Sequence, residues 1–250
     1  MRKLSFLTVS LFLMSHFVFS QENGVVSYTI TSSWYKMYAA CEYLPKADRE
    51  RNAYVWGAGR DGWDTKAELT FNANEYRYEN KIEEDMQRWR KEPDYFIYRD
   101  LANNETFDVM SLLNKEYVVQ DSIQCQNWKI KNDIKEIAGR ICMNAYCYDS
   151  LKMKEVIAWF ALDLPIPIGP EKYCGLPGMI LEVNEANGAV VYTATSILFS
   201  DEKIEIEKPV VKKKRKVIDV AEYNNIVGKY INECKKIQRP YFSWGGGIPF

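Results

Sequence analysis

A succession of short strand-like segments is the feature that most limits what this chain can form. These segments alternate apolar and polar side chains or concentrate β-branched and aromatic residues, and both patterns are typical of β-strands. Most of the links between them are short and rich in turn-forming residues, as in hairpins. The segments are residues 24–33, 65–71, 75–79, 95–101, 106–112, 117–123, 128–133, 140–148, 155–162, 179–183 and 190–199.

The shortness of the links decides how these strands pair. A link of about two to five residues can reverse the chain into an antiparallel neighbour, whereas a parallel connection needs a longer crossover. A long antiparallel meander must curl or cover its edges, which leaves a barrel, a sandwich or a curved half-barrel. We predict a mainly β fold, a curved sheet or half-barrel, because the non-strand segments 34–56 and 80–93 could supply covering helices. By analogy of pattern, this arrangement is similar to the LolA-type lipoprotein carriers, whose concave face holds an acyl chain.

The N-terminal residues have the pattern of a secretory signal peptide. Arg2 and Lys3 precede an apolar run over 4–19, and the small residue Ser20 follows. The apolar run is about 16 residues long, which is shorter than the roughly 20 that a spanning helix needs. We therefore expect cleavage after Ser20 and an exported protein with no transmembrane span after cleavage. The periplasm is the expected location, with the cell surface or the extracellular space as alternatives.

The composition changes after a predicted β domain at 21–207. Residues 208–218 contain the basic block 212–216, which indicates a solvated linker, or else a contact with acidic headgroups or an acidic partner. In the C-terminal part, 219–250, Asp219 can cap a helix whose apolar residues recur at helical spacing to about Ile237. A glycine-rich tail follows the helix. Its aromatic residues either pack back onto the β domain or form an arm that contacts a partner: Tyr241, Phe242, Trp244 and Phe250.

Cysteine usage indicates disulfides. Six cysteines follow the predicted cleavage site, and an even number in an oxidising compartment favours bridges: Cys41, Cys125, Cys142, Cys147, Cys174 and Cys234. Cys142 and Cys147 point to opposite faces of a straight strand, which argues against a bridge between them. A bridge from Cys174 to Cys147 or to Cys125 would join a loop to the sheet. The absence of C-x-x-C spacing argues against a cysteine-rich metal site.

The side chains needed for common catalytic sites are missing. The only histidine, His16, lies in the predicted signal peptide, so a Ser-His-Asp or Cys-His nucleophile and a His-ligated metal site are excluded. The glycines of 57–62 lack the spacing of a dinucleotide fingerprint. A hydrolase that uses a pair of carboxylates is possible in principle, but no residue pattern supports it. With 33 basic and 34 acidic residues, the charge balance gives no reason to expect nucleic acid, and we predict a non-enzymatic protein without a cofactor or metal.

The stretch 166–183 carries the most specific local signal. Prolines at 165, 167 and 170 keep its first part extended, since each fixes φ and removes an N–H donor. Gly175, Leu176, Pro177 and Gly178 then indicate a tight turn, and an apolar strand follows. The structural interpretation is a rigid turn between two strands. The alternative is a loop that binds something directly.

These residues also carry a family resemblance. The motif GLPGMILEV, together with Trp159, Gly169, Pro170 and the upstream segment 135–139 with Cys142, resembles the GLPGLI family of the Bacteroidetes, also called the Porph_ging family. The resemblance extends over about 128–183, and Met179 stands where the family name has leucine. It implies an exported envelope protein, often encoded beside TonB-dependent transporters, with no established chemistry.

Two functional hypotheses follow. The first is a non-enzymatic envelope protein that acts as an accessory or binding protein in outer-membrane, TonB-dependent transport; its contacts would come from 165–178 and the aromatic tail. Its partner would be a transporter or another envelope protein. The alternative is a periplasmic carrier that holds an apolar ligand, lipid or peptide in the concavity of a curved sheet, with Trp159 and Phe160 lining it.

Overall fold

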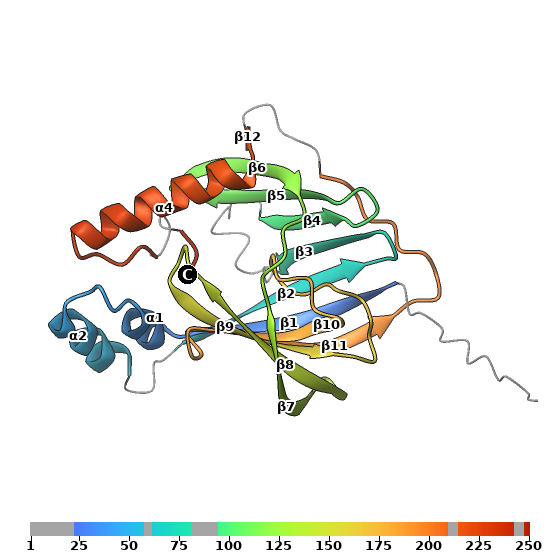
Figure 1. The fold of residues 1–250 in the computed structure, drawn as a ribbon, viewed down its shortest axis with the longest axis horizontal. Helices are drawn as coiled ribbons and strands as arrows, with labels where there is room; N and C mark the ends of the chain where they lie inside the picture. The colour runs from blue at the N-terminus through green and yellow to red at the C-terminus, as the bar shows by residue number, and fades with distance from the viewer. Residues whose placement is uncertain (1–22, 58–61, 82–94, 210–214, 243–247) are drawn as a thin grey trace, which may run out of the picture.

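The computed structural model describes residues 23–57, 62–81, 95–209, 215–242 and 248–250. Within these residues the chain forms one sheet of twelve strands and three helices (Figure 1). This confirms the predicted mainly β fold with a curved, open sheet. The predicted signal peptide, most of the segment 80–93 and of the basic block, and Trp244 lie outside the described residues.

Two antiparallel meanders share the centre of the sheet. The first runs outward from β1 at Gly24–Ser32, and the second starts at the far edge and returns to pair β11 with β1. The first continues through β2 (Trp63–Phe71), β3 (Glu75–Lys81), β4 (Phe96–Asp100), β5 (Glu105–Leu112) and β6 (Lys115–Ser122). The second contains β7 (Lys129–Ile137), β8 (Arg140–Asp149), β9 (Lys154–Ala161), β10 (Met179–Glu185) and β11 (Val190–Phe199).

The link between β6 and β7 explains why the sheet is curved. Ten strand spacings separate these two strands in the order of the sheet, which would amount to roughly 50 Å if the sheet were flat. The residues between Ser122 and Lys129 can span only about 25 Å when fully extended. The link can therefore join the two strands only because the sheet bends and brings its sides together. In Figure 1 the link passes across the sheet to reach β7.

One face of the sheet holds the core, as the period-two pattern predicts. In β1 the buried Val26, Tyr28 and Ile30 alternate with partly exposed neighbours. In β9 the same alternation buries Phe160 completely. Trp159 lies on the opposite face, where the ammonium of Lys135 stands 4.4 Å from its ring centre. The expectation that Trp159 lines the concavity was therefore wrong, because neighbouring strand residues face opposite sides.

The helices begin at identifiable caps. Ser33 caps α1 (Trp34–Ala40), and its hydroxyl accepts the Lys36 N–H at 3.2 Å. Pro45 precedes α2 (Lys46–Trp56) as its cap residue. Asp219 caps α4 (Val220–Lys236) as predicted, and the helix buries Val227, Ile231 and Cys234. None of the helices formed by the described residues is long and apolar enough to cross a membrane.

The basic segment differs from its prediction. Its last residues, Lys216–Ile218, form β12, which pairs in parallel with β6 and makes the sheet mixed. Arg215 is buried, and its Nε lies 2.8 Å from a carboxylate oxygen of Glu116. This end of the segment is thus docked and not a solvated linker. The physical reason is the free edge of β6, whose backbone groups gain hydrogen-bond partners from β12.

Candidate functional site

The glycines of the GLPG turn have a packing role. Gly175 has a φ of +88°, and a Cβ built there would lie 2.7 Å from the Cβ of Cys125. A Cβ on Gly178 would lie 2.1 Å from the carbonyl oxygen of Ala161, and one on Gly169 would lie 2.6 Å from the Cβ of Ile180. Leu176 and Pro170 are buried in the same loop, whereas Pro177 is exposed. The turn is therefore pressed against the backbone of β9 and the β6–β7 link.

Replacing Gly178 by alanine should lower the free energy of unfolding by about 3 kcal/mol, because the new Cβ overlaps a backbone carbonyl that cannot move independently. Gly228→Ala in α4 is the matched control. A Cβ there meets only the end of the Leu151 side chain at 3.3 Å, and alanine favours a helix. Urea unfolding of both variants tests this expectation. Equal stability of the two would contradict it.

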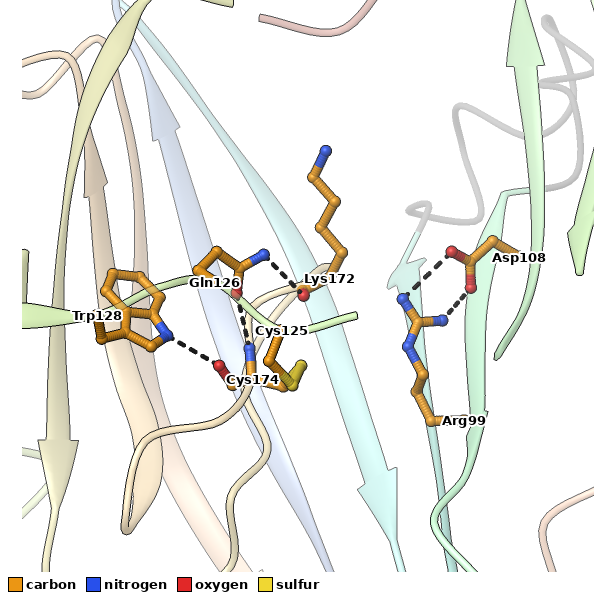
Figure 2. The surroundings of a disulfide bond; sticks show 7 residues. All are labelled: Arg99, Asp108, Cys125, Gln126, Trp128, Lys172 and Cys174. Carbon is orange, nitrogen blue, oxygen red and sulfur yellow. Dashed lines mark hydrogen bonds and ion pairs between the residues drawn. A yellow bond between two sulfur atoms is a disulfide. The ribbon is translucent and has the colours of Figure 1, made fainter. Parts of the chain in front are cut away.

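A disulfide joins this loop to the β6–β7 link. Of the two bridges predicted for Cys174, the structure forms the one to Cys125 (Figure 2). The side-chain amide of Gln126 adds two hydrogen bonds: its Nε2 donates to the Lys172 carbonyl at 3.3 Å, and its Oε1 accepts from the Cys174 N–H at 3.2 Å. The indole N–H of Trp128 donates to the Cys174 carbonyl at 2.8 Å. The loop is therefore held covalently and by its backbone groups.

The other four cysteines are buried thiols, so the expectation that they could pair is not met: Cys41, Cys142, Cys147 and Cys234. Cys142 and Cys147 are not joined to each other, as predicted from their spacing on one strand. Burial raises the pKa of the Cys41, Cys142 and Cys147 thiols to about 11. Such thiols carry little thiolate at neutral pH and are poor nucleophiles.

The anchored loop presents charged side chains to a cavity of about 120 Å³, which we call the concave-face cavity. Its walls come from β4, β5, the β8–β9 turn, the loop before Cys174, the ends of β10 and β11, α4 and residues 249–250. The charged residues that line it are Arg99, Asp108, Asp149, Lys152, Lys154, Glu171, Lys172 and Glu185. A cavity lined by four basic and four acidic side chains is suited to polar ligands.

Two buried ion pairs form parts of this wall. The ammonium of Lys154 pairs with Glu185, and both side chains are nearly inaccessible. Tyr173 donates its phenolic O–H to the other oxygen of Glu185. Arg99 pairs with both oxygens of Asp108, as Figure 2 shows. These carboxylates are satisfied, because a buried charge is tolerated only when it is paired and hydrogen-bonded.

Glu171 is a carboxyl in an unusual setting. Its backbone takes the left-handed region with a φ of 54°, which is costly for a residue other than glycine, asparagine or aspartate. Its side chain accepts the phenolic O–H of Tyr95, which comes from the start of β4. Burial raises the pKa of the Glu171 carboxyl, and the hydrogen bond from Tyr95 opposes that rise. The loop conformation thus turns this carboxyl toward the cavity wall.

Lys152 lies beside two other ammonium groups. Burial, together with the charges of Lys154 and Lys172, lowers its pKa to about 7, while Glu185 and Asp149 oppose this effect. Its Nζ donates to the main-chain oxygen of Phe250 at 2.9 Å. At neutral pH this side chain therefore carries only part of its charge.

Replacing Lys152 by methionine should raise the free energy of unfolding by about 2 kcal/mol at pH 6. In the folded protein the pKa is about 7, below the ordinary 10.5, so the unfolded chain binds more protons between these values. Wild-type stability then rises with pH through this window, and the advantage of the variant shrinks toward pH 10. Urea unfolding of both proteins at several pH values measures the difference in their free energies of unfolding. The exposed Lys46→Met variant should show no such trend, and an unchanged difference across pH would contradict the expectation.

The aromatic tail packs against the domain. Tyr241, Phe242 and Phe250 are 1%, 4% and 7% exposed, and the rings of Tyr241 and Phe250 stack at 6.0 Å. This burial matches the packing alternative from the sequence for these three side chains. The Phe250 ring also lies 4.7 Å from the ammonium of Lys154. Pro249 and Phe250 line both the concave-face cavity and a second hollow of about 240 Å³, and so lie between them.

Sequence reasoning did not identify the charged residues of this cavity. Lys152, Lys154 and Glu185 stand on separate elements with no shared spacing, so no linear pattern connects them. Glu171 and Lys172 lay inside the stretch already singled out, and charges within a proline- and glycine-rich loop were the available signal. Among the described residues, no group of three His, Cys, Asp or Glu side chains is placed to hold a metal ion.

The fold and site together define an open, curved β-sheet protein with a charged cavity behind a disulfide-anchored loop. A family model described as "Protein of unknown function (Porph_ging)" matches residues 148–182, which confirms the resemblance seen in the motif. The matched residues include Lys152, Lys154 and the whole loop from Glu171 to Gly178. Over these residues the chain is similar to the Porph_ging, or GLPGLI, family.

Solved structures show a similar fold. PNGF-II resembles this chain in its C2 crystal form with a TM-score of 0.53 at 17% identity, and in its P21 form with 0.52 at 15%. Each match covers 83% of this chain but 33% of the PNGF-II chain, so this chain spans about a third of that protein's length. At such identity the likeness concerns the fold alone. No curated protein sequence matches the chain.

Proposed function

We propose that this chain is a non-enzymatic, exported envelope protein that binds a small polar ligand in the concave-face cavity, in an accessory role linked to outer-membrane, TonB-dependent transport. The observation that carries the binding role is the set of charged side chains that line a partly open cavity whose loop is held by the Cys125–Cys174 bridge. Export is supported by the signal-peptide pattern of residues 1–20, and the transport link by the family resemblance.

The lining also supports the absence of catalysis. A glycosidase-like mechanism needs two carboxyl groups that are free to act on a substrate. Here Glu185 is occupied by Lys154 and Tyr173, and Asp108 is occupied by Arg99. The remaining carboxyls of the cavity are also hydrogen-bonded.

An apolar-ligand carrier receives less support. Ligand pockets for drug-sized molecules usually enclose about 300–1,000 Å³ and are mostly apolar. The concave-face cavity and the second hollow measure about 120 and 240 Å³, and eight charged side chains stand among the apolar and aromatic residues that line the first. A small polar molecule therefore fits the observed cavity better than an acyl chain does.

Native mass spectrometry of protein purified gently from its own cell envelope tests this proposal. We expect a discrete extra mass that is lost on denaturation, and a lower occupancy in a Lys172→Met variant than in the exposed control Lys46→Met. A co-purifying envelope protein in stoichiometric amount would support the accessory role and identify the partner. Bare monomer from wild type and from both variants would overturn the proposal.

A further inference from the structure

The concave-face cavity contains ammonium groups that form no ion pair with a carboxylate of the described residues. Lys154 has its partner in Glu185. Within the described part of the chain, Lys152 forms no ion pair, and its one hydrogen bond goes to the Phe250 main-chain oxygen. The ammonium of Lys172 has neither an ion pair nor a hydrogen bond there, and it lies 5.8 Å from the ring centre of Tyr223. In Figure 2 the Lys172 side chain extends away from the disulfide and no dashed line reaches its ammonium.

The acidic groups of the cavity form their hydrogen bonds and ion pairs with other groups, although burial of Lys172 is outweighed by Tyr223, Asp149, Glu185 and Glu171, which raise its pKa. Both oxygens of Glu185 are used by Lys154 and Tyr173, and Glu171 accepts from Tyr95. Asp149 accepts the backbone N–H groups of residues 151 and 152 at 3.0 Å each, which fixes it in the β8–β9 turn. None of them is placed within 4 Å of the Lys152 or Lys172 ammonium as a salt bridge would require.

We propose that Lys152 and Lys172 bind an oxyanion of the ligand, a carboxylate or a tetrahedral phosphate-type group, in the concave-face cavity. The inference rests on the proposed binding role of this cavity and names the chemistry of what it binds. An ammonium has three N–H donors, of which Lys152 uses one on Phe250 and Lys172 uses none. These donors open onto a space of about 120 Å³, which is large enough for a group of a few heavy atoms.

The charge of Lys152 supports the same ligand class. Burial and the nearby Lys154 and Lys172 depress its pKa to about 7, against the opposing influence of Glu185 and Asp149. A bound anion would favour the charged form of Lys152 and raise its pKa. Anion binding should therefore take up a proton near neutral pH and weaken as the pH rises above 7.

The Phe250 contact shows how a ligand oxygen can be held. Its main-chain oxygen already accepts from Lys152, and its ring lies on the ammonium of Lys154. The main-chain oxygen and the ring of Phe250 thus lie side by side at this wall of the cavity. A ligand oxyanion would use the remaining donors of Lys152 together with those of Lys172.

The test measures binding of three defined compounds to the purified protein by calorimetry at pH 6 and pH 8.5: acetate, sulfate and the neutral acetamide. Acetate represents carboxylates, and sulfate represents tetrahedral oxyanions with a constant charge over this range. We expect one of the two anions to bind at least tenfold more tightly than acetamide, and more weakly at pH 8.5. Binding of acetate would indicate that the ligand's charged group is a carboxylate, and binding of sulfate would indicate a tetrahedral oxyanion.

Variants separate this inference from the general binding role. The Lys152→Met/Lys172→Met double variant should lose at least tenfold in anion affinity, whereas Lys46→Met should bind as wild type does. Carbon-13 NMR of the lysine side chains gives a second readout, because the bound anion should raise the pH at which Lys152 titrates. Equal anion affinity in the double variant and in Lys46→Met, or an unmoved Lys152 titration, would overturn the inference. A natural ligand seen by native mass spectrometry would then leave the binding role intact.

Discussion

Replacing Cys174 by alanine will lower the free energy of unfolding by about 4 kcal/mol under oxidising conditions. The Cys125–Cys174 bridge closes a loop with a sequence separation of 49 residues, and its loss restores that loop's freedom to the unfolded chain. The loop it anchors carries Glu171 and Lys172, so the variant should also weaken ligand binding in the concave-face cavity. Urea unfolding without and with a thiol reductant measures the first effect.

The reductant supplies the control. Reduced wild-type protein should approach the stability of Cys174→Ala, because both lack the bridge. Cys147→Ala removes a buried thiol that forms no bridge, so the reductant should lower its stability by about as much as that of wild type. If the reductant leaves wild-type stability unchanged, the stabilising role of the bridge is wrong.

Replacing Lys154 by methionine will lower the free energy of unfolding by about 3 kcal/mol at pH 7. The change leaves the Glu185 carboxylate buried with only the Tyr173 hydroxyl as a partner, and an uncompensated buried charge is costly. Denaturant unfolding at pH 7 measures the loss.

A double variant tests whether charge is the cause. Lys154→Met/Glu185→Gln removes both charges and should recover most of the lost stability, because a neutral amide can still accept from Tyr173. If the double variant loses as much stability as Lys154→Met and Glu185→Gln lose together, packing and not the ion pair accounts for the effect.

The strands and the last helix were accessible to sequence reasoning because their signals are local. Each predicted strand segment overlaps a strand of the structure, and the helix that Asp219 caps ends at Lys236, close to the predicted Ile237. Alternating side chains and a capping carboxylate act within a few residues, so neighbouring sequence suffices to read them. The segment 34–56, expected to supply covering helices, contains α1 and α2.

The errors concern contacts between distant residues. Lys216–Ile218 form β12 only because β6 offers a free edge, and no local pattern reports that edge. The sequence alone allowed the tail either to pack on the domain or to extend from it. In the structure Phe250 packs, since it is buried with its ring beside Lys154. The two predicted partners of Cys174 were equally plausible until the β6–β7 link placed Cys125 beside the turn.

The sequence by itself determined the class of fold, the family motif and the exclusion of histidine chemistry, because composition and short-range periodicity specify which faces are apolar and which side chains are available. Only the tertiary structure decided the site. Lys152, Glu171, Lys172 and Glu185 come from a turn, a loop and a strand end, and they meet because a curved sheet and one disulfide bring these elements together. Such a meeting depends on the shape of the whole sheet, which no short stretch of sequence encodes.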